Sequence, residues 1–260
     1  MSAPPLHVAT WNVNGIRARE ARVLDWLAAA QPDVLCLQET KVTDDKFPVE
    51  VFREAGYEIA WHGQPKYNGV AILSRAPLDD VEVSFGDAED DEQARFIAAT
   101  TMGVRVMCAY VPNGQAVDSP KFAYKLRWFD RLTRHLDTHV EVTGSALLCG
   151  DFNVAPADLD VHDPQAWRGH VLCTVEEREA LARVCGDRLL DLVRRLHPGS
   201  PMYSWWDYRQ LGFPKNRGLR IDHILVTPAL GARAVDAGVD REARKGKQPS
   251  DHAPVWARFA

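Results

Sequence analysis

The sequence predicts an α/β fold, built as one domain over residues 1–260, with two stacked mixed sheets and helices outside them. Short apolar segments typical of buried strands alternate with helical patterns along the whole chain. No stretch rich in proline, glycine or serine divides the chain. Asn12 and Asn14 follow the first strand two positions apart, and Asp151 and Asn153 follow a later strand in the same way. This repetition suggests two related halves that face each other.

Four strands and one helix are expected in the first part of the chain. The strand patterns cover Leu6–Asn12 and residues 33–37, 57–62 and 69–74. A helix is expected over residues 19–30, where apolar residues recur at helical spacing before Gln31 and Pro32 end it. The second strand delivers Glu39 at its end, where the alternative to a functional role is an exposed loop charge.

The middle of the chain adds two strands and a charged helix. Strands are expected over residues 94–101 and Val104–Tyr110, and an amphipathic helix over residues 120–136. Its apolar face, which contains Trp128, Phe129 and Leu132, is expected in the core. The charges expected on its solvent side are Lys121, Lys125, Arg127, Arg131 and Arg134.

The last part begins with an apolar strand that Gly150 interrupts, directly before Asp151. Helices are expected over residues 175–184 and 188–196, and strands over residues 219–226 and Val255–Phe259. Residues 203–220 are irregular and rich in Trp, Gly, Pro and Arg, which favours an ordered functional loop.

Composition narrows the class of protein. A hydrophobic content of 46% and a charged content of 26% are those of a globular protein, and no apolar stretch is long enough to cross a membrane. The first residues lack the pattern of a signal peptide, so a cytoplasmic location is expected. The five cysteines are widely spaced, without a C-x-x-C pair, and are expected as reduced core residues.

The net charge of −5 is unevenly distributed. Residues 79–92 hold eight acids and no base, so the remainder carries +3. The acidic run is expected as a solvated loop. Residues 192–220 hold five Arg and one Lys against one acid, with aromatic residues between the bases. A solvated face is the alternative, but interleaved aromatic residues favour contact with nucleic acid.

Several strand ends carry polar side chains. Asp151 and Asn153 lie two positions apart after an apolar strand, so their side chains are expected on the same side, facing one cavity. A carboxylate that accepts a proton and an amide that donates hydrogen bonds suit a phosphate and an attacking water. The alternative is an Asx-turn or a helix cap. The strand ends also supply Asn12, Glu39 and Asp222, and Asp251 and His252 precede the last strand, so the set indicates a hydrolytic site.

A hard cation such as Mg²⁺ fits this set, because it takes few carboxylates and leaves coordination positions for phosphate oxygens. Glu39 is the first choice of ligand. The chain has no His-rich or Cys-rich set for zinc, and no glycine-rich nucleotide-binding loop.

Seven motifs in order resemble the exonuclease III family of the endonuclease/exonuclease/phosphatase superfamily. They are N-x-N-G (12–15), L-Q-E-T-K (37–41), Y-V-P-N-G (110–114), C-G-D-F-N-V-A-P-A-D-L-D (149–160), S-W-W-D-Y-R (204–209), N-R-G-L-R-I-D-H (216–223) and P-S-D-H-A-P-V (249–255). The resemblance implies a four-layered α/β sandwich and a phosphodiesterase dependent on Mg²⁺, or on Mn²⁺. It also implies incision of double-stranded DNA 5′ to abasic sites and trimming of 3′ ends.

The same resemblance assigns roles to residues of the site. Glu39 matches the principal metal ligand, with Asn12 and Asp251 close to the metal. Asp151 matches the residue that deprotonates the water or protonates the leaving oxygen, and Asn153 the residue that orients it. Asp222 and His252 match an Asp-His pair, and the imidazolium suits a non-bridging phosphate oxygen. Tyr110 matches a hydroxyl donor to that phosphate. The general base stays open between Asp151 and His252, and Asn14, where some animal relatives carry an acid, makes a second metal site doubtful.

Further residues match the DNA contacts of the family. Arg95, Gln115 and Lys121 resemble backbone or abasic-site contacts. Trp205, Leu219 and Ile221 resemble the apolar pocket that accepts a flipped-out sugar without a base. We expect three further cations, Arg209, Lys215 and Arg217, to bind phosphates or to plug the duplex. For Trp206, a core position that supports the loop is the alternative to DNA contact.

The sequence thus predicts a monomeric DNA-repair nuclease. The first rival is another branch of the superfamily, a phosphatase or phospholipase acting on inositol phosphates or sphingomyelin. The second is a non-catalytic DNA-binding scaffold. The balance between incision at abasic sites and 3′-to-5′ exonuclease activity stays open at this stage.

Overall fold

Two six-stranded mixed sheets form the centre of the molecule. The computed structural model describes residues 4–89 and 91–260. The first sheet runs in the order β13 (Ala234–Val239), β14 (Val255–Phe259), β1 (Leu6–Asn12), β2 (Val34–Gln38), β4 (Val70–Ser74) and β3 (Glu58–His62). The second runs in the order β5 (Asp79–Glu82), β6 (Phe96–Thr101), β7 (Val104–Tyr110), β8 (Ala146–Asp151), β12 (Asp222–Val226) and β9 (Leu190–Asp191). β10 (Trp205–Trp206) and β11 (Gly218–Leu219) form a small third sheet.

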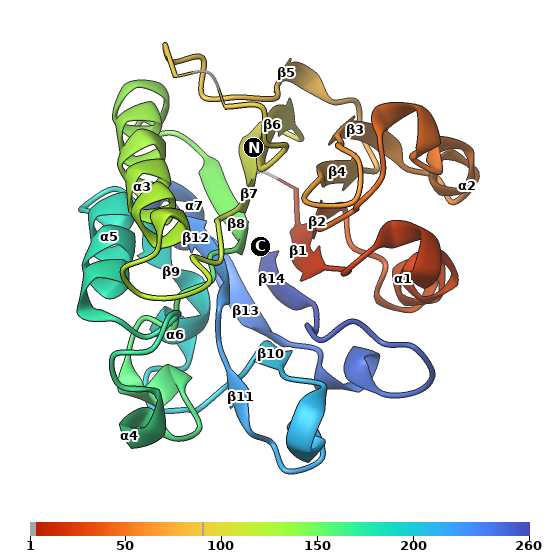
Figure 1. Ribbon diagram of the computed structural model, residues 1–260. Coiled ribbons are helices and arrows are strands. Elements are labelled where there is room, and N and C mark those ends of the chain that lie inside the picture. The colour runs from red at the N-terminus through yellow and green to blue at the C-terminus, as the bar shows by residue number, and fades with distance from the viewer. Residues whose placement is uncertain (1–3, 90) are drawn as a thin grey trace.

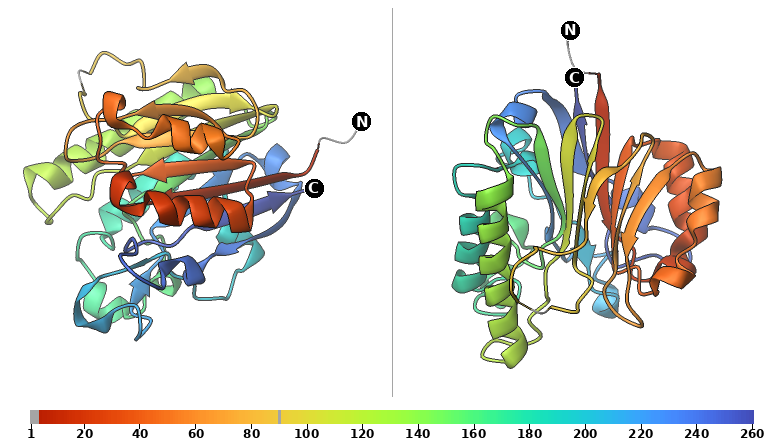
Figure 2. Two further views of the ribbon diagram at one scale, coloured as in Figure 1. Left: turned by 90° about the vertical axis from the view of Figure 1, so that its right-hand side faces the viewer. Right: turned by 90° about the horizontal axis from the view of Figure 1, so that it is seen from above.

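Helices cover the outer faces of the two sheets, so the expected four-layered α/β sandwich is confirmed (Figure 2). α1 (Ile16–Ala30) and α2 (Val49–Glu54) lie outside the first sheet, and α3 (Pro120–His139) and α5 (Val175–Cys185) outside the second (Figure 1). The shorter helices are α4 (Pro164–Trp167), α6 (Leu192–Leu196) and α7 (Pro228–Gly231), and 3₁₀ turns occur at Asp44–Lys46, Asp158–Asp160, Arg209–Leu211 and Arg241–Arg244. Within the described ranges, no helix has the length and apolar character needed to cross a membrane.

The apolar core follows these layers. One cluster lies between the sheets and includes Val8, Cys36 and Ile224. A second cluster packs the second sheet against α3 and α5, and it contains Trp128 and Phe129, which are buried as predicted. A third joins the first sheet to α1 and α2. All five cysteines are free thiols, and four of them are buried.

Most predicted elements are present, and the differences lie at their boundaries. α1 begins three residues earlier than predicted, at Ile16, whose N–H donates to the carbonyl of Thr40 across the sheet edge. The helix predicted over residues 188–196 is wrong in its first part, because residues Leu190–Asp191 pair with β12 and Asp191 then caps α6. The strand predicted over 219–226 is split, because Ser204 Oγ accepts the N–H groups of Ile221 and Asp222 at the break.

The prediction that Lys125 and Arg131 face solvent is wrong. Lys125 is fully buried and Arg131 is 4% exposed. Each pairs with acids distant in sequence, Lys125 with Glu177 and Arg131 with Asp87 and Asp91. A charged side chain stays inside a fold when it is paired and hydrogen-bonded.

The acidic run over residues 79–92 is only in part a solvated loop. Asp79–Glu82 form the edge strand β5, which pairs with β6. Asp87 and Asp91 bind the Arg131 guanidinium, and the Tyr124 hydroxyl donates to Asp91. Asp90 lies outside the described residues. The run therefore neutralises Arg131, a buried cation of α3.

Candidate active site

The polar side chains predicted at strand ends lie at one edge of both sheets. β1 runs parallel to β2, and β7 runs parallel to β8, so Asn12 and Glu39 come from the carboxyl ends of one pair and Tyr110 and Asp151 from those of the other. Asp222 begins the antiparallel strand β12, directly opposite Asp151. Asn12 Nδ2 lies 2.9 Å from Asp151 Oδ2 and so joins the two sheets.

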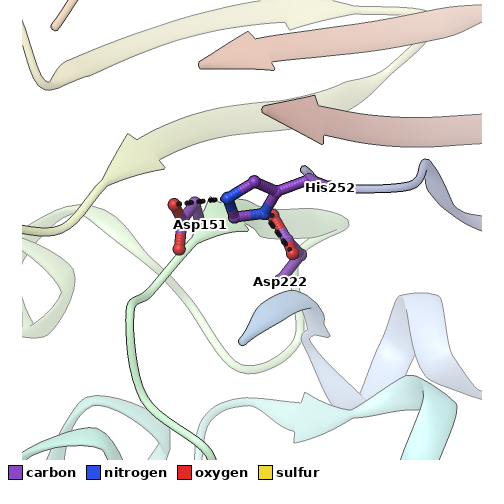
Figure 3. Close-up of side chains that lie close together, drawn as sticks. All are labelled: Asp151, Asp222 and His252. Atoms are coloured by element: carbon purple, nitrogen blue, oxygen red, sulfur yellow. Dashed lines mark hydrogen bonds and ion pairs between the residues drawn. The ribbon is translucent and has the colours of Figure 1, made fainter. Parts of the chain in front are cut away.

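His252 lies between two aspartates (Figure 3). Its Nδ1 is 2.9 Å from Asp222 Oδ2, and its Nε2 is 3.7 Å from Asp151 Oδ2. Burial alone would lower the pKa of the imidazole, but Asp222 and Asp151 outweigh burial and raise it to about 10. His252 is therefore an imidazolium at neutral pH, oriented by Asp222.

The Asp151 carboxyl has a pKa close to neutral pH, so both its protonated and its ionised form are accessible. Burial raises the pKa of its carboxyl to about 7, together with the charges of Asp222 and Glu39, although His252 and the Asn12 hydrogen bond act in the opposite direction. Its Oδ1 accepts the backbone N–H of Asn153 at 2.9 Å. A carboxyl with a pKa near neutrality can both take up and release a proton during one reaction.

Glu39 lies in the opposite environment. Burial would raise the pKa of its carboxyl, but Lys41, the Asn12 amide and His252 outweigh burial and lower it. Glu39 Oε1 accepts hydrogen bonds from Asn12 Nδ2 (2.9 Å) and from the Tyr110 hydroxyl (2.8 Å). Burial and Glu39 raise the pKa of Tyr110 well above its ordinary value, so its hydroxyl is a neutral donor.

The surroundings of Glu39 fit a cation. The Lys41 ammonium lies 2.6 Å from Glu39 Oε2 and 2.6 Å from Asn14 Oδ1, so two oxygen atoms already hold a positive charge there. Oxygen ligands of this kind are those that hard divalent cations take. Asp251 lies beside them, with Oδ1 bonded by Asn14 Nδ2 and Oδ2 by Trp205 Nε1.

A second arrangement of ligand atoms is also present. Asp151, Asp222 and His252 have potential ligand atoms within 4.8 Å of one another, and this buried group could bind a metal. The raised pKa of His252 favours its charged form, whereas metal binding requires the neutral imidazole. The ionised Glu39 is therefore the better place for a hard cation, and the Asp-His group suits proton transfer.

Asn153 lies beside Asp151 but does not continue the strand. Its φ of 51° is in the left-handed region, so the alternation expected of an extended segment does not apply to it. Its Oδ1 accepts a hydrogen bond from Asn113 Nδ2, and its Nδ2 donates to the carbonyl of Val111. The Asx-turn weighed as an alternative is present at Asp151, together with the site residues around it.

Three predicted DNA contacts line one cavity. Arg95, Gln115 and Lys121 border a polar hollow of about 880 Å³ that reaches Tyr110. The guanidinium of Arg95 lies 4.7 Å from the centroid of the Tyr110 ring. Sequence reasoning did not assign the other polar lining residues to the site, namely Gln64, Tyr67, Asn68, Gln93, Asn113 and Tyr124. One of them lay in a motif already noted, Asn113 in Y-V-P-N-G.

The expected apolar sugar pocket is closed. Leu219 and Ile221 are 0% and 1% exposed, within a cluster that also contains Val161 and Leu172. Trp205 is half-buried and packs edge-to-face on Trp167, with ring centroids 6.3 Å apart. Trp206 is buried, which supports the core alternative. Arg209, Lys215 and Arg217 are exposed on the neighbouring loop.

Comparison with known proteins agrees with this geometry. Residues 9–252 match the model of the Endonuclease/Exonuclease/phosphatase family. The exodeoxyribonuclease III of Haemophilus influenzae is 37% identical, over 96% of this chain and 98% of its own length. A 3′ phosphatase of Neisseria, solved with a product DNA hairpin, has a TM-score of 0.95 and 44% identity, over 98% of this chain and 99% of its own. An AP endonuclease of Archaeoglobus fulgidus has a TM-score of 0.95 and 40% identity, with the same coverage. The chain therefore belongs to the exonuclease III and AP endonuclease family of the endonuclease/exonuclease/phosphatase superfamily and is an exodeoxyribonuclease III-like hydrolase.

Proposed function

We propose that this protein is a Mg²⁺-dependent phosphoesterase of double-stranded DNA that acts on 3′ ends, removing 3′ phosphates and 3′ nucleotides. The observation that carries the proposal is the pair of carboxyl groups in opposite states, the ionised Glu39 and the protonatable Asp151, beside a polar cavity with two cations. Such a site serves hydrolysis of a phosphoester by water. Similarity to the Neisseria 3′ phosphatase supports the choice of 3′ ends.

In the proposed reaction, Asp151 takes a proton from the attacking water or returns one to the leaving oxygen. We assign the base role to Asp151, because His252 is already protonated at neutral pH and cannot accept a proton. His252 instead donates to a non-bridging phosphate oxygen as negative charge develops there. Asn153 orients the reacting groups, and Tyr110 offers its hydroxyl to the same phosphate. Mg²⁺, or Mn²⁺, held through Glu39 with Asn12 and Asp251 nearby, would neutralise charge on the phosphate.

Incision 5′ to abasic sites is the second candidate, and similarity to the Archaeoglobus AP endonuclease favours it. This activity needs a pocket for a sugar without a base, formed by Trp205, Leu219 and Ile221. Since Leu219 and Ile221 are buried, the pocket has to open before a sugar can enter. We therefore expect incision to be slower than 3′ processing. In both reactions the DNA backbone would be bound by Arg95, Gln115 and Lys121, and by Arg209, Lys215 and Arg217 of the loop between β10 and β11.

We further propose that the two sheets form one domain, because both contribute side chains to one site. We also propose that the enzyme acts as a monomer. A cytoplasmic location is in keeping with its free thiols.

The deciding experiment uses three labelled duplexes, with Mg²⁺ or with EDTA. One carries a nick with a 3′ phosphate, one a recessed 3′ hydroxyl, and one an internal tetrahydrofuran residue. We expect Mg²⁺-dependent loss of the 3′ phosphate, and slower cutting at the tetrahydrofuran. Fast cutting at the tetrahydrofuran with inert 3′ ends would favour the second candidate. Hydrolysis of inositol phosphates or sphingomyelin without DNA cleavage would move the enzyme to the rival branch, and metal-independent binding without cleavage would indicate a scaffold.

A further inference from the structure

A fully buried ion pair lies behind the proposed site. Lys125 of α3 and Glu177 of α5 both have side chains that are 0% exposed. Burying two charges costs desolvation energy, and apolar residues of similar size are often as stable in their place. Stability alone therefore does not account for charged residues at these two positions.

The Lys125 ammonium has three partners, which matches its three hydrogen-bond donors. It donates to the backbone carbonyl of Asn153 at 2.7 Å, to the carbonyl of Asn113 at 3.1 Å and to Glu177 Oε1. The methylene chain of Lys125 also lies under Gly114, where a Cβ would be 3.2 Å from Lys125 Cδ. One buried cation thus ties the loop that follows β7 to the loop that follows β8.

Glu177 completes the arrangement on its other side. Its Oε1 also accepts the N–H of Leu172 at 3.0 Å. Its Oε2 accepts the N–H of Thr174 at 3.0 Å and the Thr174 hydroxyl at 2.8 Å. The Thr174 N–H bond to Oε2 and the Glu177 N–H bond to the Thr174 hydroxyl form the capping box of α5 and leave Oε1 directed at Lys125. The ammonium is therefore held from a rigid helix end.

The two loops carry the amides next to Asp151. Asn113 Nδ2 donates to Asn153 Oδ1 at 2.9 Å, and Asn153 Nδ2 donates to the carbonyl of Val111 at 3.0 Å. The Asn153 N–H in turn donates to Asp151 Oδ1 at 2.9 Å. Because Asn153 has a left-handed backbone, its position depends on these bonds rather than on a strand.

We propose that Lys125 is a positioning residue for the hydrolysis, whose ammonium, anchored by Glu177, fixes the carbonyls of Asn113 and Asn153 and so the Asn153 amide beside Asp151. The proposal rests on the function proposed for Asp151 and Asn153. An apolar pair would fill the same space but would leave both carbonyls without their shared donor. A displacement of about 1 Å at a reacting group costs on the order of 100-fold in rate.

The test separates stability from positioning. In the double variant Lys125→Met/Glu177→Leu we expect a folded protein with a lowered Tm, because no buried charge is left unpaired but the backbone groups that Lys125 and Glu177 bond lose their partners. We expect its kcat for 3′-phosphate removal to fall about 100-fold, with KM within about threefold, because the loss concerns the transition state. If the apolar double variant does not fold, Lys125→Gln/Glu177→Gln supplies the same comparison, since glutamine is too short to reach both carbonyls.

The matched control is Arg131→Met, which removes another buried cation of the same helix. We expect it to lower Tm and to leave kcat unchanged, showing that lost stability alone does not slow the reaction. A folded double variant with wild-type kcat would overturn the proposal while leaving the proposed function intact. Full activity in Asp151→Asn would remove the site assignment itself, and the proposal with it.

Discussion

The turns that follow β1 and β8 have the same backbone and different chemistry. Asn14 and Asn153 have φ values of 49° and 51°. Asn12 Oδ1 accepts the N–H of Asn14 at 3.0 Å, as Asp151 Oδ1 accepts that of Asn153. Each strand also lies between one parallel and one antiparallel neighbour. The expected relation between the two halves of the chain is therefore seen at their strand ends.

The difference lies in the charges around each turn. The first has a neutral amide, Asn12, next to the ionised Glu39 and the Lys41 ammonium. The second has the protonatable Asp151 next to the His252 imidazolium. In the function proposed above, the same turn geometry would serve cation binding in one sheet and proton transfer in the other, because the neighbouring charges differ.

The largest effect is expected when the second turn is made like the first. Asp151→Asn keeps an Asx-turn, as Asn12 shows, but removes the proton acceptor. We expect kcat to fall by about 10³-fold or more, within the range lost with a general base, and Tm to stay unchanged or to rise. Single-turnover cleavage and thermal unfolding measure the two quantities. Activity within tenfold of the wild type would show that Asp151 is not the base.

The reverse change, Asn12→Asp, makes the first turn like the second. It places a carboxyl against Glu39 and Asp151 and removes both amide hydrogen bonds. We expect stability to fall by about 3 kcal/mol at pH 8, since hydrogen bonds to charged groups are worth about 1.5–3 kcal/mol each. The loss should be smaller at pH 5, where carboxyl groups with raised pKa values are protonated. Denaturant unfolding at both pH values tests this, and an equal loss at the two would contradict it.

His252 predicts a dependence of stability on pH. Its folded pKa of about 10 exceeds the ordinary value of 6.5, so the folded state binds the proton more tightly. The stabilisation is fully present below pH 6.5 and is lost as the pH rises towards 10, because each tenfold difference in proton affinity is worth about 1.4 kcal/mol. Unfolding in EDTA between pH 6 and 10 should show this decline in the wild type and a flatter profile in His252→Asn. Parallel profiles of the two proteins would show that protonation of His252 does not stabilise the fold.

The smallest effect is expected at Asn14. Asn14→Gly suits the left-handed backbone and removes the contacts with Lys41 and Asp251, both of which remain partly exposed. We expect a stability change below about 1 kcal/mol and a threefold or smaller change in kcat. Asn153→Gly, measured beside it, should lower kcat about 100-fold, because its amide lies next to the reacting groups. Equal effects of the two substitutions would mean that the turns are not specialised.

Sequence patterns predicted the elements of the sandwich and the residues at the strand ends, because periodicity and strand length are local properties. They missed β5, whose residues are largely exposed and charged, and β13, which contains the exposed Val235 and Asp236 and a glycine. Pairing with a neighbour, rather than an apolar pattern, makes these segments strands. They also did not anticipate that Leu219 and Ile221 would be packed away from solvent. Whether an apolar side chain lines a pocket or fills a core depends on the segments that cover it.

The sequence by itself determined the layers of the fold and the placing of Asn12, Glu39 and Asp151 at strand ends, since strands end where apolar runs stop. Only the tertiary structure decided which of these groups hold a proton. The pKa of Asp151 rises mainly because the folded chain buries it, with the charges of Asp222 and Glu39 adding to the rise. The pKa of Glu39 falls because Lys41, the Asn12 amide and His252 outweigh its burial. The tertiary structure also decided that Lys125 is buried, because its partner Glu177 lies 52 residues away in the sequence. Electrostatic interactions act through space, so charge states follow from contacts that no local pattern encodes.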